Sequence, residues 1–410
     1  MMLNKRDLSF TVFAIINTLF SIKYFSRYTD YYLLFAVALL FIQIFLFYKR
    51  DNLIKVATDK CNIINITILA VFCLASIYLF SKIPAKSSNS DRWSVITSFW
   101  DSFFNGEYVY YAKSHLDNYP GPMPFYFILA LPFYFIGELG LFSLMGIIVF
   151  YFLMRYIKTS PSFQTIFLLL ILSSPFYLWE ISVRSNIFLN STIVVFSIVF
   201  IFKIINKEST TETQFHAHPQ TLHEGGFFGK DYNKSKFSNV SLKNQLLMGL
   251  VLGLMMSTRN IFALCYVILF LYFLKNKQLD IISTLKIGCF AIFIFFLTFI
   301  PFISGHVNDF MQMNPFIIQS SYLMPVELSI FAVFCSFFMF LFCRKELDVF
   351  FYSGVILFLT ITMHLLYHSF DESFQKAIFE SYADISYFIL CIPFFLYYML
   401  KTDNKKIVSL

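Results

Sequence analysis

The stretch 90–137 holds most of the side chains that could do chemistry in this sequence. Its carboxylates are Asp91, Asp101, Glu107 and Asp117. Asp91 lies just beyond the end of the apolar segment 63–82, where a carboxylate is partly desolvated and still meets water. Such a group suits a general base, which must reach the proton of an attacking hydroxyl. The alternative for Asp91 is a solvated loop residue that caps a helix over 92–104.

Two arginines suggest a second kind of chemistry. Arg184 and Arg259 each stand in a short turn between apolar segments. The forked donors of a guanidinium group match a phosphate, so both are candidates for holding the phosphate of a lipid-linked substrate. The alternative is that each arginine only extends its charged group to the membrane surface.

Composition indicates the class of protein that must position these groups. Of the 410 residues, 58% are hydrophobic and 13% are charged, and 57 are Phe and 25 are Tyr. A soluble chain carries about 25% charged residues. Apolar stretches recur along the sequence, and many approach the ~20 residues that cross the hydrocarbon of a bilayer. We therefore expect an all-α, polytopic membrane protein.

The apolar pattern predicts about twelve spans. They are expected at 8–25, 31–48, 63–82, 139–157, 162–179, 187–205, 244–257, 260–274, 283–304, 326–343, 348–367 and 383–400. Most of the 31 lysines and arginines then fall on one side, which predicts that both termini are cytoplasmic. The segment 123–137 contains Pro132 and is too short for a span, so an interfacial helix is expected there.

This register divides the chain into three parts. N-terminal spans occupy 1–82, a large outer loop with interfacial helices occupies 83–138, and a transmembrane bundle occupies 139–410. The inner loop 206–243 is polar and is expected to be flexible, and a metal site at its histidines is the less favoured interpretation. No phosphate-binding Gly-rich loop occurs in the sequence, so we expect no ATPase domain in this chain.

The order of features from Asp91 onward resembles the GT-C superfamily of integral-membrane glycosyltransferases. The similarity is closest to the bacterial branch related to protein O-mannosyltransferases and lipid A aminoarabinose transferases. The residues that carry it are Asp91, the turn Asn105-Gly106-Glu107-Tyr108, the run Tyr119-Pro120-Gly121-Pro122, and the apolar segment Phe125–Gly137. The turn with Arg184 and Asn186, and the Gly-rich span 248–259 ending at Arg259, continue the order.

The resemblance implies a reaction and a site. Asp91 would be the catalytic base that activates an acceptor hydroxyl. That hydroxyl would attack a sugar carried on polyprenyl phosphate, with inversion, on the outer face of the inner membrane. The acceptor would be a lipid, a glycan or a protein. The implied substrate-binding residues are Arg92, Glu107, Lys113, Tyr119, Arg184, Asn186 and Arg259.

Other interpretations stay open at this point. An O-antigen polymerase or ligase shares the spans and the lipid-linked substrates, but usually places its main loop late in the chain. A transporter or flippase for lipid-linked glycans would more often show internal repeats and ionisable residues within spans. The sequence indicates no particular cofactor, and outer carboxylates such as Asp91 and Asp309 leave a divalent metal ion as an option. Nothing in the sequence indicates a nucleic-acid partner.

Overall fold

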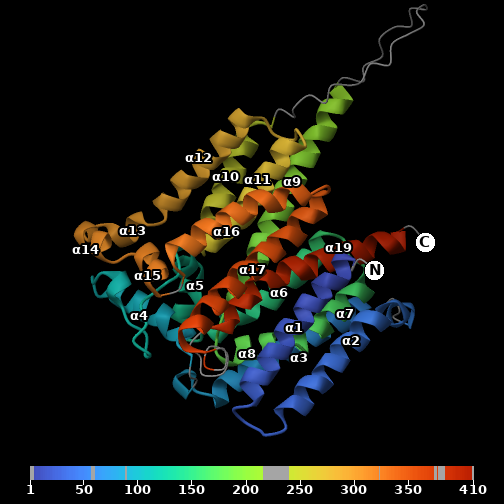
Figure 1. Cartoon of the computed structure of the whole chain (residues 1–410), viewed down its shortest axis with the longest axis horizontal. Coiled ribbons are helices and arrows are strands. Elements are labelled where there is room, and N and C mark those ends of the chain that lie inside the picture. Colours follow the sequence, from blue (N-terminus) through green and yellow to red (C-terminus); the bar gives the residue numbers. More distant parts are fainter. Residues whose placement is uncertain are drawn as a thin grey trace, which may run out of the picture.

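The computed structural model describes residues 4–56, 61–87, 90–215, 240–322, 324–373, 376 and 384–408, and this part of the chain is all-α. The predicted fold class is therefore confirmed at this level. The inner loop expected at 206–243 falls largely outside the described residues, as do its three histidines. Figure 1 shows the helices packed side by side, with α9 (Ile187–Phe215) running through the bundle.

The helices follow one another along the whole described chain. The other α-helices are α1 (Lys5–Phe25), α2 (Tyr32–Val56), α3 (Cys61–Lys82), α4 (Arg92–Phe104), α5 (Pro124–Ile136), α6 (Gly140–Tyr156), α7 (Pro161–Leu172), α8 (Pro175–Ser182), α10 (Leu242–Met256), α11 (Ala263–Lys275), α12 (Ile281–Leu297), α13 (Ile300–Ile303), α14 (Val307–Gln312), α15 (Pro315–Tyr322), α16 (Val326–Met339), α17 (Glu346–Glu372) and α19 (Ile392–Val408). Short 3-10 helices are η1 (Ala85–Ser87), η2 (Val109–Tyr111), η3 (Asn260–Phe262), η4 (Phe340–Phe342) and η5 (Ile385–Cys391).

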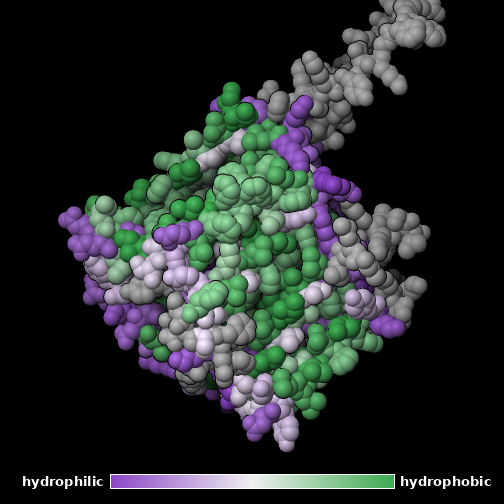
Figure 2. Space-filling view, viewed as in Figure 1, coloured by the Kyte–Doolittle hydropathy of each residue, from purple (hydrophilic) through white to green (hydrophobic). Residues whose placement is uncertain are grey.

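Among the described residues, 7 helices are long and apolar enough to cross a membrane, or up to 9 if each bent pair counts as one span. A multi-pass membrane protein is thus supported, while the count of about twelve stays a prediction. Figure 2 shows apolar side chains over much of one face. Many large apolar residues are exposed, as expected for surfaces that meet lipid. Examples are Leu34, Phe41, Leu74 and Phe334.

One predicted span differs from a straight helix. The segment 162–179 is broken into α7 and α8, which meet at an angle of 65°. Pro175 opens α8 and lacks an amide hydrogen, and it biases Ser174 away from helical geometry, where ψ is 127°. The bend carries the following turn, with Arg184 and Asn186, toward the centre of the molecule.

The predicted outer loop 83–138 contains the two helices α4 and α5. Each has 13 residues, so α5 is only about 20 Å long and does not span a bilayer. The two helices pack through a stacked pair, Phe99 and Phe127, whose ring centroids are 3.7 Å apart. The loop also contacts the later segment α13–α15, because the Tyr108 hydroxyl donates to the Met313 carbonyl at 2.6 Å.

The termini lie away from these short helices. In Figure 1 the N and C labels are at the right, whereas α4, α13, α14 and α15 gather at the left. An ion pair joins the two ends of the chain, since Arg6 Nη1 lies 3.2 Å from Asp403 Oδ1. This arrangement separates α4 and α13–α15 from both termini.

Candidate functional site

The site centres on the ring of Tyr387, at the start of η5. The guanidinium of Arg92 lies 5.1 Å from the ring centroid and that of Arg259 lies 5.6 Å from it. The Arg259 guanidinium also lies 5.5 Å from the ring of Tyr126, which comes from α5. Two cations from distant parts of the sequence therefore meet around two tyrosines, in a cation–π arrangement that partly offsets their burial.

The turn 257–259 is docked onto the start of α5. Ser257 Oγ accepts from the Phe125 amide at 3.1 Å, and the Thr258 carbonyl accepts from the Met123 amide at 3.3 Å. These bonds satisfy amides that a helix N-terminus leaves free. They fix Arg259, the next residue, beside Tyr126.

Close helix packing holds this turn in place. A side chain at Gly253 of α10 would clash with the Ala291 carbonyl oxygen of α12 and would lie 2.8 Å from Ile294 Cβ. Gly249, one turn earlier, is almost as close to Phe290. Small residues four apart let two helices in a membrane approach closely. The close contact of α10 with α12 thus fixes the position of the turn that holds Arg259, at the end of the Gly-rich span.

Arg259 has no anionic partner in the described chain. It is 8% exposed, makes no ion pair with a described carboxylate, and its Nε has no hydrogen-bond partner. A buried guanidinium group without a counter-charge is costly. Arg92 differs, because it pairs with Asp384 and contacts Ser386 Oγ at 2.9 Å. The cluster therefore contains one buried cation that has no carboxylate partner among the described residues.

Electrostatics keep Arg92 charged. Burial alone lowers the pKa of Arg92, but the neighbouring Tyr387 and Asp91 more than offset this effect, so its pKa is raised. Asp384 in turn holds η5 in position, because its Oδ1 accepts from the Ser386 amide at 2.9 Å. The same carboxylate thus starts η5 and orients the arginine of α4.

Asp91 stands at the N-cap position of α4, but its side chain makes no capping hydrogen bond. Its Oδ2 instead accepts from Ser114 Oγ at 2.9 Å and from Asn118 Nδ2 at 2.8 Å. Its Oδ1 has no hydrogen-bond partner in the described part of the chain. The carboxylate is held from one side and half-buried, so one oxygen stays available to accept a proton.

Asn186 joins this cluster through Tyr126, whose hydroxyl it adjoins. Asn186 is 2% exposed and its Nδ2 has no hydrogen-bond partner among the described residues. Glu180 holds the same turn, since it accepts from the Phe188 amide at the start of α9 at 2.9 Å. Asn186 is therefore a buried side-chain amide beside Tyr126, the tyrosine that Arg259 also contacts.

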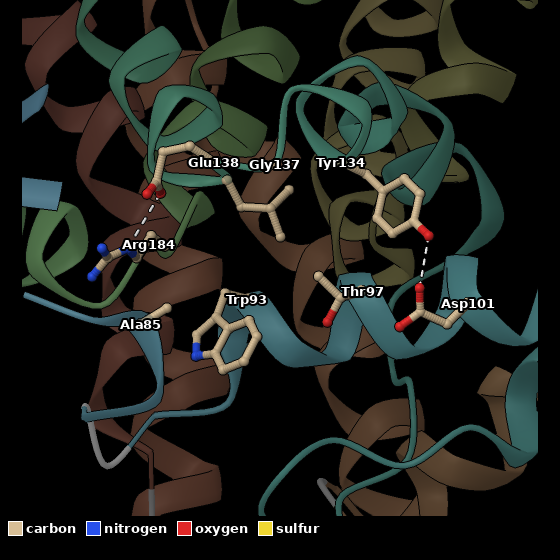
Figure 3. Close-up of a pocket in the computed structure, with 9 residues that line it drawn as sticks. Ala85, Trp93, Thr97, Asp101, Tyr134, Gly137, Glu138 and Arg184 are labelled. Atoms are coloured by element: carbon tan, nitrogen blue, oxygen red, sulfur yellow. Dashed lines mark hydrogen bonds and ion pairs between the residues drawn. The ribbon is translucent and has the colours of Figure 1, made fainter. Parts of the chain in front are cut away.

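Arg184 lies apart from this cluster, although it is only two residues from Asn186. Its Nε donates to Glu138 at 3.3 Å, and its Nη2 donates to the carbonyls of Phe80 at 3.3 Å and Ile83 at 2.7 Å. Figure 3 shows its side chain turned toward Glu138. The Arg184 backbone is left-handed, with φ of 55°. These bonds occupy the donors that a phosphate would need.

The remaining candidates lie in the outer loop. Glu107 is exposed and accepts from Ser102 Oγ at 3.4 Å. Lys113 is exposed, lies 5.4 Å from the ring of Tyr119, and faces Asp117 at 3.9 Å. None of these three predicted residues, Glu107, Lys113 and Tyr119, contacts Arg92 or Arg259 in the described structure. They form the rim of the loop, outside the arginine cluster.

A metal centre receives no support from the described residues, because no group of three His, Cys, Asp or Glu side chains converges there. Asp309 pairs with His306 at 3.1 Å, whereas Asp91 is held by Ser114 and Asn118. The two carboxylates named in the sequence as potential ligands thus have separate partners.

No protein-family model, curated protein or solved structure matches this chain. The argument for function therefore rests on the residues themselves. Sequence reasoning missed Tyr126, Tyr387, Ser114 and Asn118. Ser114 and Asn118 could have been predicted, because they lie in the same loop as Asp91. Nothing in the sequence distinguishes Tyr126 and Tyr387 from the other aromatic residues around them.

Proposed function

We propose that this chain is a membrane glycosyltransferase of GT-C type, using a sugar donor linked to polyprenyl phosphate. The observation that carries the proposal is the buried guanidinium of Arg259, which has no carboxylate partner in the described chain. It shares the ring of Tyr387 with Arg92, and Arg92 directly follows Asp91 in the sequence. A buried cation without a carboxylate partner, together with a half-buried carboxylate adjacent to Arg92, is what transfer from a phosphate leaving group needs. The resemblance in the order of sequence features points to the same reaction.

The proposed reaction is a single displacement. The acceptor hydroxyl attacks the anomeric carbon, and its proton passes to Asp91 Oδ1. The bond from the anomeric carbon to the phosphate oxygen breaks, and the electron pair leaves with the phosphate. Arg259 and Arg92 would stabilise the negative charge that develops on the leaving oxygen. Attack from the side opposite the phosphate inverts the anomeric configuration.

Asn186, Tyr126 and Tyr387 would complete the phosphate site. An amide and hydroxyls supply hydrogen bonds without adding charge. Because the region is only partly open to water, each charged hydrogen bond there is worth more than at a free surface. No bound metal enters this scheme.

We place the site on the extracytoplasmic face of the inner membrane. With about twelve spans, both termini would be cytoplasmic, and α4 and α5 would lie at the outer interface. The apolar tail of the donor would then remain in the bilayer while its phosphate reaches Arg259. Acceptors could approach the loop from water or from the outer leaflet.

The test measures transfer from a panel of radiolabelled polyprenyl-phosphate sugars, with the purified chain in lipid nanodiscs and membrane glycolipids as acceptors. We expect transfer and release of polyprenyl phosphate, both lost in Asp91→Asn. The matched control is Asp117→Asn, which changes an exposed loop carboxylate at a positive φ that Asn tolerates. Full transfer by Asp91→Asn would remove Asp91 as the base.

The same assay separates the rival functions. A flippase would move the lipid-linked sugar between leaflets without breaking the bond to phosphate. A polymerase or ligase would consume diphosphate-linked oligosaccharides and leave monophosphate-linked sugars untouched. Either result would contradict the proposed reaction.

A further inference from the structure

A cavity of about 250 Å³ lies between α4 and the end of α5, and Arg184 is among its lining residues. Figure 3 shows α4 passing along it, with Trp93, Thr97 and Asp101 projecting from that helix. These residues are four apart, so they form one stripe along α4. Tyr134 and Glu138 line the opposite wall.

Each of the two carboxylates in the cavity walls accepts hydrogen bonds from the described residues through only one of its oxygens. Asp101 Oδ1 accepts from the Tyr134 hydroxyl at 2.7 Å, and Glu138 Oε1 accepts from the Gly140 amide at 2.7 Å and from Arg184. The second oxygen of each carboxylate has no hydrogen-bond partner within the described chain. Two fixed oxygens are therefore open to donors from a ligand.

Trp93 forms the aromatic part of the α4 wall. Its ring is held in place, because it stacks on His115 with centroids 5.3 Å apart. Its Nε1 is buried and has no hydrogen-bond partner in the described chain, so the indole offers the cavity its ring and not an exposed donor.

This combination indicates the chemistry of the ligand. Rigid aromatic rings pack against an apolar ring face, while carboxylates accept hydrogen bonds from hydroxyls. A phosphate is disfavoured, because two carboxylates face the cavity and only Arg184 offsets them. The volume falls just below the ~300 Å³ at which pockets enclose drug-sized ligands, so it suits a single sugar ring.

We propose that this cavity binds a neutral pyranose, the terminal sugar of a glycan acceptor. The assignment of the sugar as acceptor rests on the proposed function, whereas binding of the sugar does not. Asp91 stands at the N-cap of the helix that carries the cavity stripe, and Trp93 follows it by two residues. The stripe extends about 12 Å along α4 from that end. The cavity stripe thus begins two residues after the proposed base along the chain.

The experiment titrates the purified full-length chain in nanodiscs with the methyl pyranosides of glucose, galactose and mannose. Binding is followed by tryptophan fluorescence, which reports on Trp93, Trp100 and Trp179. We expect a saturable change with at least one pyranoside, and loss of that change in Trp93→Phe. Asp101→Asn removes one open acceptor and should weaken binding at least tenfold, while Asp117→Asn should bind as the wild type does.

Two ligands test the specificity of the cavity. Choline probes the alternative that carboxylates and aromatic rings hold an ammonium group, and inorganic phosphate probes an anion site. A response to choline alone, or to none of the pyranosides, would overturn the proposal. Thermal melting and gel filtration of each variant show that a lost response does not come from unfolding.

Asp91→Asn distinguishes this proposal from the proposed function. If that variant binds the sugar normally and transfers nothing, both hold. If sugars bind but the wild-type chain transfers from no donor, the cavity assignment stands and the reaction falls. If transfer occurs and its acceptor KM is unchanged in Asp101→Asn, the reaction stands and the cavity assignment falls.

Discussion

Arg259 lies 5.6 Å from the ring of Tyr387 and, although it is buried, has no carboxylate partner in the described chain. A protein that places a guanidinium group in this way gives up stability in its empty state. Binding of an anion would recover it. The missing carboxylate partner distinguishes Arg259 from arginines such as Arg6 and Arg50, which form salt bridges with Asp403.

Replacement of Arg259 by Met should therefore weaken donor binding without lowering stability. A hydrogen bond to a charged group is worth about 1.5–3 kcal/mol, so the donor KM should rise roughly tenfold or more. The melting temperature should stay the same or increase, because an unpaired buried charge is lost. Arg27→Met changes an exposed arginine that also lies over a tyrosine, and it should alter neither value. A lower melting temperature in Arg259→Met would contradict the argument.

The carboxylate of Asp91 depends on its loop partners for orientation. Asn118→Ala removes the 2.8 Å bond to Oδ2 and leaves Ser114 in place. We expect kcat to fall about tenfold, the scale of a misplaced general base, while the donor KM changes little. Steady-state kinetics against Asn105→Ala, an exposed residue of the same loop, provide the comparison. A change in KM alone would indicate that Asn118 binds substrate instead.

Arg184 should matter for stability and not for the donor. Arg184→Lys cannot reproduce bonds to Glu138 and to two carbonyls at once. Because Glu138 is about one-third exposed, we expect a loss of roughly 2–3 kcal/mol, below the 3–5 kcal/mol of a fully buried pair. Thermal melting should detect the loss. A donor KM that rises at unchanged stability would instead assign Arg184 to the phosphate.

The contact of α10 with α12 offers a test of how the Arg259 turn is positioned. Gly253→Ala places a methyl group against the Ala291 carbonyl, which should cost about 1–3 kcal/mol and raise the donor KM. Gly288→Ala on α12 meets nothing within 4 Å and should be neutral or slightly stabilising. Equal effects of the two substitutions would show that this contact does not set the site.

The predicted topology has a direct test. A green fluorescent protein fused after Leu410 should fluoresce, because both termini are expected in the cytoplasm. A cysteine at Asp117, in a chain whose seven native cysteines are replaced, should react with an impermeant maleimide on intact spheroplasts. Labelling only after lysis would place the 83–138 loop inside and would overturn the proposed location of the site.

The sequence predicts the fold class well because hydrophobic length is a direct physical requirement of the bilayer. It also indicates α5 as a short helix, since Pro124 opens it and Gly137, with φ of 85°, ends it. The break before Pro175 was available from the same reasoning about proline, yet the apolar run around it concealed the bend.

Side-chain direction is what sequence reasoning could not supply. Arg184 and Arg259 stand in similar turns, and only the structure shows that Arg184 turns to Glu138 while Arg259 turns to Tyr126. Tyr387 is one of 25 tyrosines, and its role follows from a contact with Arg92 that no local pattern encodes. Asp91 was found because it lies just beyond the end of an apolar span, and Arg92 through the resemblance in the order of sequence features.

The contribution of η5 to the cluster has a consequence for biogenesis. Asp91 and Arg92 emerge early during synthesis and Arg259 later, but Tyr387 and Asp384 follow only near the end of the chain. At about 5–20 residues per second, translation leaves the two arginines without their shared ring for roughly 6–26 seconds after Arg259 is made. A nascent chain, or one that stalls before η5, therefore lacks the assembled anion site. Catalytic competence would switch on only when insertion is complete.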